Sequence, residues 1–415
     1  MGLLNDTSEV NPWLNETNLW LFIEEERGSQ QQPLNTAVPL TVINGLIFIT
    51  GITGNVGVCI VIRKNSMLHT ATHYFLFNLA VADLILLIFG LPNDVALYWH
   101  QYPWILGVFF CKLRGLISEM ASYVSVMTIV VFSTERYLAI CHPLQMQTLA
   151  GLPRAVKTIV CLWLIGLLTA LPFYFLMDVH YLTYPKNSTD AIVIKESAVC
   201  GMRNQPKNFP LIELSFAFFF ILPLIIIFIQ YIKMSSSIAQ SEKPLDGMGG
   251  SVNEDRLRRR AQSNKSIVRM LLAVVLGFFC CWAPFHAQRL VIIHASDWEY
   301  IDEFNVWMFF ATGIFYYFSS TLNPILYNVM SRKMRKAFKY TFRSMFSKQS
   351  EQRILRNSDL SSTTFHGRNS RSFREETQVI FGNGRLSVKR KNNIENDVRN
   401  GKRYDLIQMQ NESIV

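Results

Sequence analysis

Charged side chains are scarce in this sequence. Only 17% of its 415 residues are Asp, Glu, Lys or Arg, whereas 50% are hydrophobic. That is too little charge to cover a soluble globule of this size, so a soluble enzyme or a nucleic-acid-binding domain is not expected. The sequence also lacks a metal-ligand cluster and a nucleophile–base pair in or beside its apolar runs, which argues further against an enzyme.

Long apolar runs divide the sequence. Four of them contain no charged residue: Val38 to Ile62, Thr158 to Met177, Met270 to Gln288 and Phe304 to Ser331. Three more contain one or two charges each: Tyr74 to Tyr98, Gly115 to Thr134 and Pro210 to Ile232. Each is about as long as the roughly 20 helical residues that cross a bilayer. The sequence therefore predicts an all-α membrane protein, a bundle of seven transmembrane helices with disordered termini.

Basic residues concentrate at one end of the chain and predict its orientation. From Arg332 onward there are 19 Lys and Arg against 8 Asp and Glu, a surplus of 11 in a chain whose net charge is +10. The links after the first, third and fifth runs are also basic, while Glu24 to Glu26 make the other side acidic. Since basic loops stay in the cytoplasm, we expect a plasma-membrane protein with its N-terminus outside. Membrane lipids, and no nucleic acid, are the expected anionic partners of the tail.

The chain divides into three parts on this interpretation. Residues 1–37 are an extracellular tail, 38–345 the seven-helix domain and 346–415 a cytoplasmic tail. Met330 to Phe342 alternates basic and apolar residues at helical spacing, which predicts a short amphipathic eighth helix on the inner leaflet. No signal peptide is visible in the first 30 residues, so the first transmembrane helix is expected to direct insertion.

Glycosylation sites and cysteines fit the same topology. Sequons at Asn5, Asn15 and Asn187 fall on the predicted outer side, where glycosylation takes place. Of the seven cysteines, only Cys111 and Cys200 face the exterior. A disulfide between them would join the outer end of the third helix to the second outer loop.

Asp83 is an ionisable residue at mid-depth of the second helix, where burial of a charge is costly. Asn55, Ser125 and Asn323 are predicted at similar depth on other helices. These oxygen ligands could hold a sodium ion or a proton, and a hydrogen-bonded cluster without an ion is the alternative.

Two carboxylates, Glu119 on the third helix and Asp94 near the outer end of the second, open toward the outer vestibule. They favour a cationic ligand group, and a guanidinium fits best because it pairs bidentately with a carboxylate. Arg289 lies at a similar depth, either in an internal ion pair with one of them or displaced by the ligand, and both can be true. Further candidate ligand contacts, most of which we expect to be packing residues, are Phe285, His286, Phe309, Tyr316 and Tyr317.

Glu135-Arg136-Tyr137 stands at the inner end of the third helix. Arg136 either extends its charge to the membrane surface or acts as a switch whose release opens an inner cleft.

Together, these positions resemble the rhodopsin-like (class A) G-protein-coupled receptors over about residues 38 to 342. The motifs are Gly54-Asn55, Leu79-Ala80-Val81-Ala82-Asp83, Cys111, Glu135-Arg136-Tyr137, Trp163, Pro223, Tyr231, Cys281-Trp282-Ala283-Pro284 and Asn323-Pro324-Ile325-Leu326-Tyr327.

The resemblance implies a mechanism. A ligand drives rotation of the sixth helix, relayed by Trp282 and by packing of Pro223, Val126 and Phe278. Arg136 then rearranges with Tyr231 and Tyr327, and the inner cleft accepts the C-terminal helix of a Gα subunit, with Leu144 as a further G-protein contact. Asn264 and Lys265 stand where many members have an acidic partner for Arg136, so appreciable basal activity is expected.

Two departures exclude other ligand classes. Phe304 to Ser331 contains no lysine, and Tyr317 stands where opsins carry the retinal-binding lysine, which excludes a photoreceptor. Ser118 stands where amine receptors carry aspartate, so a biogenic amine is not expected.

Cys281-Trp282-Ala283-Pro284-Phe285-His286-Ala287-Gln288-Arg289-Leu290 resembles the neuromedin U, pyrokinin and CAPA receptor group. Pro92-Asn93-Asp94 and Trp99 to Trp104 look most like the arthropod CAPA (periviscerokinin) branch. The group implies an amidated neuropeptide ending in Pro-Arg-X, whose arginine Asp94 and Glu119 would take, with signalling through Gq, phospholipase C and calcium. Pyrokinin, ecdysis-triggering hormone and neuromedin U-like peptides are the alternative ligands.

The tail adds three expected partners. Serines beside arginines, at Arg368 to Ser372 and Arg385-Leu386-Ser387, suit receptor kinases and then arrestin. Glu412 to Val415 resembles a PDZ-binding end. A seven-helix transporter or channel using Asp83 as its ion site is the remote alternative, and the sequence shows no inverted repeat to support it.

Overall fold

The computed structural model describes residues 16–145, 151–185, 191–202, 209–242, 252–295, 297–330 and 333–344. The predicted glycosylation sites Asn5, Asn15 and Asn187 lie outside the described residues, as do the tail serines and the C-terminal Glu412 to Val415.

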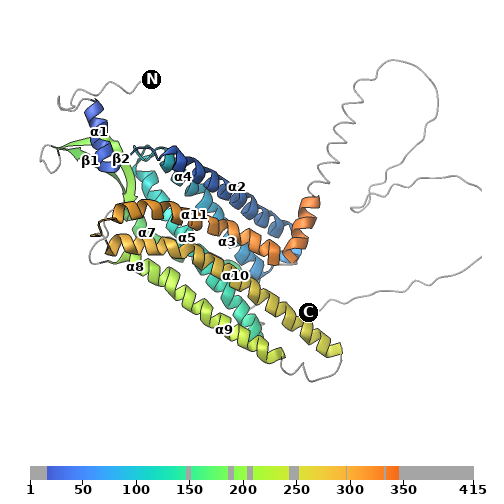
Figure 1. Ribbon diagram of the computed structural model, residues 1–415. Helices are drawn as coiled ribbons and strands as arrows, with labels where there is room; N and C mark the ends of the chain where they lie inside the picture. The colour runs from blue at the N-terminus through green and yellow to red at the C-terminus, as the bar shows by residue number, and fades with distance from the viewer. Residues whose placement is uncertain are drawn as a thin grey trace, which may run out of the picture. The chain divides into compact units, whose positions relative to one another are not determined.

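Seven helical segments form a bundle (Figure 1). They are α2 (Leu34–Lys64), α3 (Ala71–Phe89) continued by α4 (Leu91–Trp99), α5 (Gly107–Cys141), α7 (Leu152–Leu176), α8 (Leu211–Phe216) continued by η2 (Ala217–Ile221) and α9 (Leu222–Glu242), α10 (Val252–His294) and α11 (Ile301–Met330). In the described part of the chain, six of the seven are long and apolar enough to cross a membrane. The seventh, α11, carries a more polar buried run that includes Ser319, Ser320, Thr321 and Asn323. The predicted seven-helix bundle is confirmed.

Prolines and glycines shape the helices at two places. The second transmembrane segment breaks at Gly90, and Pro92 lies in the first turn of α4. Pro324 lies inside α11 and packs against Gly54 of α2, where an added Cβ would lie 3.0 Å from the Pro324 Cβ. Glycine at this position therefore lets the two helices approach closely.

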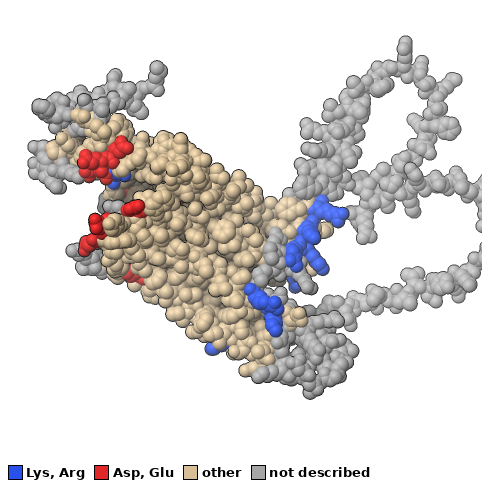
Figure 2. Space-filling view, viewed as in Figure 1, with Lys and Arg blue, Asp and Glu red and all other residues tan. Residues whose placement is uncertain are grey.

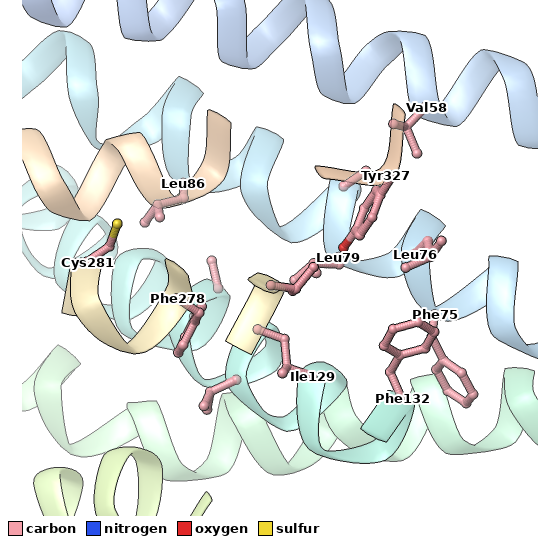
Figure 3. Packing of buried hydrophobic residues seen from close by; sticks show 14 of the residues in the cluster. Val58, Phe75, Leu76, Leu79, Leu86, Ile129, Phe132, Phe278, Cys281 and Tyr327 are labelled. Atoms are coloured by element: carbon pink, nitrogen blue, oxygen red, sulfur yellow. The ribbon is translucent and has the colours of Figure 1, made fainter. Parts of the chain in front are cut away.

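The main hydrophobic core lies between α2, α3, α5, α10 and α11. Figure 3 shows residues of this cluster from each of these helices. Its labelled members are Val58, Phe75, Leu76, Leu79, Leu86, Ile129, Phe132, Phe278, Cys281 and Tyr327.

The two ends of the bundle differ in charge. Residues 333–344 form the predicted eighth helix at one end, with Met334 fully buried and Lys333, Arg335 and Lys336 exposed. At the opposite end, Glu24 to Glu26 are exposed. Figure 2 shows this separation as blue and red patches. It supports the predicted orientation, which stays a prediction, and we accordingly use inner for the basic end and outer for the acidic end.

The outer end contains two elements that the sequence did not predict. Residues 16–27, expected to be part of a disordered tail, form α1 (Glu16–Arg27). A hairpin of β1 (Met177–Tyr184) and β2 (Ile192–Met202) pairs antiparallel, with Val179 opposite Cys200. The predicted disulfide between Cys200 and Cys111 is present, with the two Cα atoms 5.6 Å apart, and it joins β2 to α5.

The helix α1 is ordered because it packs on the outer loops. The Ile23 side chain is 0% exposed and clusters with Tyr102 and Ile194. The Tyr102 hydroxyl donates to the Gly28 carbonyl at 2.7 Å, and Gln30 Nε2 donates to the Tyr102 carbonyl at 2.7 Å. Burial, reinforced by Glu24, raises the pKa of Tyr102, so the phenol keeps its proton and continues to donate at neutral pH.

Substitution of Ile23 tests this packing. We expect Ile23→Ala to weaken the attachment of α1 by about 2 kcal/mol or more, because it leaves a cavity against Tyr102 and Ile194. Hydrogen exchange at the α1 amides should then accelerate. Leu21→Ala on the same helix is the control, since Leu21 is 60% exposed. Equal exchange rates in both variants would contradict the proposed packing.

Candidate functional site

Glu119 and Arg289 form an ion pair that joins α5 to α10. Arg289 Nη2 donates to Glu119 Oε1, and the carboxylate is buried. The guanidinium also lies over the Phe285 ring at 4.3 Å and the Phe173 ring at 5.5 Å. The internal pair expected for Arg289 is therefore observed with Glu119, and stacking on two aromatic faces adds to its stability.

Asp94 in the first turn of α4 is also paired with an arginine of this chain. Arg114 of α5 donates from Nη2 to Asp94 Oδ1, and the Tyr317 hydroxyl donates to Oδ2 at 2.7 Å. With its amide oriented to satisfy hydrogen bonding, Asn93 accepts from Arg114 Nε at 3.0 Å. Both oxygens of the Asp94 carboxylate are thus engaged.

Arg114 is a site residue that sequence reasoning missed. It lies one residue before the apolar run Gly115 to Thr134, so it counted as lying outside the membrane. Its position three residues after Cys111, on the helix that also carries Glu119, was the available signal.

The charges of the two ion pairs sum to zero. Asp94 and Glu119 contribute two negative charges, and Arg114 and Arg289 contribute two positive charges. An unpaired charge in this low-dielectric setting would cost several kcal/mol, which is why each has a partner. A cationic ligand group that approaches either carboxylate therefore competes with an internal arginine.

Aromatic side chains connect Arg289 to the interior of the bundle. The Phe285 ring stacks with Tyr316 at 5.0 Å, and Tyr316 contacts Trp282 at 4.8 Å. The Tyr316 and Ser122 hydroxyls are 2.8 Å apart. Trp282 in turn stacks with Phe278 at 5.1 Å. This continuous set of contacts leads from the outer ion pair to the core.

Little empty space remains beside these rings. A cavity of about 10 Å³, enough for about one water molecule, lies among residues of α5, α10 and the η2 segment. Its lining residues are Glu119, Ser122, Tyr123, Val126, Phe219, Phe278, Trp282, Phe285 and His286. A ligand group can enter here only if Arg289 or the rings move.

The structure does not place every predicted ligand contact in this set. His286 joins it, because its ring lies 4.9 Å from Phe220 and 6.2 Å from Trp282. Phe309 instead packs with the separate cluster of Tyr98, Phe310 and Ala37, between α11, α4 and α2.

Asp83 is buried in the middle of the bundle and accepts a hydrogen bond from Asn323 Nδ2 at 2.9 Å. Ser125 is buried as well. The Asn55 amide group donates elsewhere, to the backbone carbonyls of Gly51 and Ser320, both at 2.9 Å. The Asn55 carbonyl oxygen is buried and accepts no hydrogen bond from the described residues. Hard cations prefer oxygen ligands such as these, and the sodium site at Asp83, Ser125 and Asn323 stays a prediction.

At the inner end, Glu135 is paired with Arg154 of α7 rather than with its neighbour Arg136. The Arg154 Nη2 and Glu135 Oε1 atoms are 2.8 Å apart. The Arg136 guanidinium lies over the Phe132 ring at 5.6 Å.

The predicted switch tyrosines occupy separate packed positions. Tyr231 and Tyr137 pack against a cluster of Met234, Ile238 and Val268. Tyr327 is buried in the main core, and its hydroxyl has no hydrogen-bond partner among the described residues.

The remaining predicted positions are accounted for. Val126 and Phe278 share the main core, and Pro223 follows η2 as the second residue of α9. Leu144 is exposed at the inner end, as a docking residue must be.

Comparison with known proteins identifies relatives. Residues 54–327 match the family described as 7 transmembrane receptor (rhodopsin family). The chain is 34% identical to the pyrokinin-1 receptor of Drosophila melanogaster over 371 residues, covering 76% of this chain and 82% of the relative. It is 35% identical over 345 residues to the neuromedin U receptor homologue nmur-2 of Caenorhabditis elegans, covering 78% and 84%. It is 33% identical over 347 residues to the mouse neuromedin-U receptor 2, covering 82% and 84%.

A double-mutant cycle tests the Glu119–Arg289 pair. Arg289→Met leaves Glu119 buried without a partner and should lower stability by roughly 3 kcal/mol. The double variant Glu119→Gln/Arg289→Met should be less destabilised than the sum of the two single variants by about 1 kcal/mol or more. Thermal unfolding of the solubilised protein measures both. Arg269→Met, at an exposed position of the same helix, is the control. If the destabilisations of the two single variants simply add in the double variant, the Glu119–Arg289 pair is contradicted.

Proposed function

The chain belongs to the rhodopsin family of seven-transmembrane receptors, and from this premise we propose that it is a G-protein-coupled receptor for an amidated neuropeptide ending in Pro-Arg-X, of CAPA type. The relatives are named for pyrokinin and neuromedin U, which are peptides. The observation that carries the proposal is that Glu119 is held by an internal guanidinium in the outer half of the bundle. An arginine side chain of a ligand is chemically equivalent to that partner.

Binding is an exchange of arginines at Glu119. The ligand guanidinium takes the carboxylate, so Glu119 stays paired, and the released Arg289, whose side chain is partly exposed, turns its charge to solvent. Because Arg289 is on α10 and Glu119 on α5, the exchange removes the tie between these helices. Phe285, Tyr316 and Trp282 then repack and pass the change toward Phe278 and the core.

Asp94 has a second and more indirect role in ligand binding. Its two oxygens are held by Arg114 and Tyr317, so a ligand cation competes with both donors there. The Tyr317 ring also contacts Tyr316 at 5.0 Å, which links Asp94 to the aromatic set. A ligand that pulls on Asp94 therefore disturbs the same rings.

Amidation of the ligand suits this site. A free C-terminal carboxylate next to the ligand arginine would compete with Glu119 for the ligand guanidinium. An amide removes that competing charge and keeps hydrogen-bond donors and acceptors. The C-terminal group of the peptide therefore contributes to discrimination between ligands.

At the inner end, we propose that α10 rotates and that Arg136 rearranges with Tyr231 and Tyr327. The cleft then accepts the C-terminal helix of a Gα subunit, with Leu144 as a second contact, and signalling proceeds through Gq, phospholipase C and calcium. The protein lies in the plasma membrane, with its N-terminus outside the cell. Receptor kinases, arrestin and a PDZ protein act on the C-terminal tail.

Pyrokinin is the second candidate ligand, and neuromedin U-like or ecdysis-triggering peptides are further ones. The names of the relatives favour pyrokinin and neuromedin U over CAPA. All these ligands place an arginine at Glu119, so the geometry of this site does not separate them. A transporter or channel is disfavoured by the family match.

Intracellular calcium in cells expressing the chain tests the proposal. Amidated peptides ending in Pro-Arg-Val should elicit responses at concentrations on the order of nanomolar, ahead of peptides ending in Pro-Arg-Leu. The non-amidated forms should be inactive. Silence toward all amidated forms, with the receptor shown on the cell surface, would remove the ligand assignment. A preference for the leucine ending would select the pyrokinin alternative.

Neutral variants of the carboxylates test the site itself. Glu119→Gln and Asp94→Asn should each weaken peptide potency by roughly tenfold or more, because each removes a charged partner, while surface expression persists. Glu299→Gln, at an exposed position between α10 and α11, is the matched control and should leave potency unchanged. Unchanged potency in both carboxylate variants would refute their proposed role.

A further inference from the structure

The inner end contains an ion pair that the proposed function does not use. Glu135 of α5 is 6% exposed and receives Arg154 of α7 at 2.8 Å. Arg154 is the third residue of α7, directly after Pro153. It therefore reaches α5 from the first turn of a neighbouring helix.

This pairing leaves Arg136 without an anionic partner. No ion pair or hydrogen bond to Arg136 occurs within the described residues, and its Nε is buried and unpartnered. Arg136 lies over the Phe132 ring and interacts electrostatically with His73 and Glu135. A buried hydrogen-bond donor without an acceptor raises the free energy of the folded protein. A conformation that supplies an acceptor is therefore favoured.

Glu135 is the acceptor nearest to Arg136 along the chain, because the two residues are neighbours on α5. Side-chain rotation alone would bring the two charges together if Arg154 let go. The Glu135 carboxylate therefore has two competing cationic partners, Arg154 and Arg136.

We propose that Arg154 is a positioning residue for signalling, which holds Glu135 away from Arg136 and so keeps Arg136 available to the G protein. The inference rests on the proposed G-protein coupling and names a residue that regulates it. When Arg154 is lost, Glu135 turns to Arg136, the new pair fixes Arg136 against α5, and the inner cleft loses the cation that contacts Gα.

A purely structural role for Arg154 predicts something different. Its side chain is 39% exposed, and ion pairs that are this accessible contribute little to folding stability. Its removal is therefore expected to change signalling more than the amount of folded receptor.

The test measures guanine-nucleotide exchange without any peptide. Membranes with equal surface amounts of each variant are mixed with purified heterotrimeric G protein of the Gq class, with Gi and Gs proteins in parallel. Arg154→Gln should lower basal exchange by about threefold or more. The double variant Arg154→Gln/Glu135→Gln should recover it, because no carboxylate remains to hold Arg136. Lys157→Gln, exposed one turn along α7, is the matched control and should leave exchange unchanged.

The outcomes separate this inference from the proposed function. Unchanged exchange in Arg154→Gln, an equal loss in Lys157→Gln, or no recovery in the double variant would each overturn the role of Arg154 alone. Absence of peptide-independent exchange by the unmodified chain with all three G-protein classes would overturn this inference, because no available Arg136 would then be signalling, while coupling of the peptide-bound receptor is decided by the calcium measurement. A failure of the peptide assignment would leave the measurement unaffected, since no peptide is added.

Discussion

The ion pair between Glu119 and Arg289 is the interaction on which the outer half of the bundle depends. A charge inside a membrane protein needs a partner, and here the partner comes from the helix across the bundle. The same constraint explains why Asp94 is held by Arg114 and Tyr317. Because both carboxylates are satisfied, the site is neutral and nearly closed, with space for about one water molecule. A ligand arginine can replace Arg289 without leaving Glu119 unpaired, and the released Arg289, whose side chain is partly exposed, can turn its charge to solvent.

The outer loops hold the elements around this site in place. The disulfide fixes β2 to α5, the helix that carries both Arg114 and Glu119. The helix α1 packs through Ile23 on Tyr102 and Ile194, and Arg27 donates to the His180 carbonyl at 3.2 Å. Pairing also governs the inner end, where Glu135 takes Arg154 and Arg136 has no ion-pair partner among the described residues. At both ends, a buried carboxylate is held by an arginine from another helix.

Much of the fold could be predicted from the sequence because a bilayer imposes simple rules on composition. Runs without charge located the spanning helices, and only Cys111 and Cys200 lay where a disulfide forms. The helix α1 was missed because its order comes from burial of Ile23 against residues distant in sequence. Arg114 was missed because it lies one residue outside an apolar run. Asn55 and Asp83 are predicted at similar depth in the membrane. Depth does not determine which way a side chain points, and the Asn55 amide group donates to the Ser320 carbonyl. Glu135 is adjacent to Arg136 in the sequence, but in the folded chain it pairs with Arg154, 19 residues further on.

An experimental structure of the receptor bound to an amidated Pro-Arg-X peptide would test the exchange of arginines most directly. The account predicts that a guanidinium nitrogen of the peptide lies within hydrogen-bonding distance of Glu119 and that Arg289 has left it. It also predicts that the rings of Phe285, Tyr316 and Trp282 have moved. A bound peptide with the Glu119–Arg289 pair intact would contradict the account and place the recognition of the ligand arginine elsewhere.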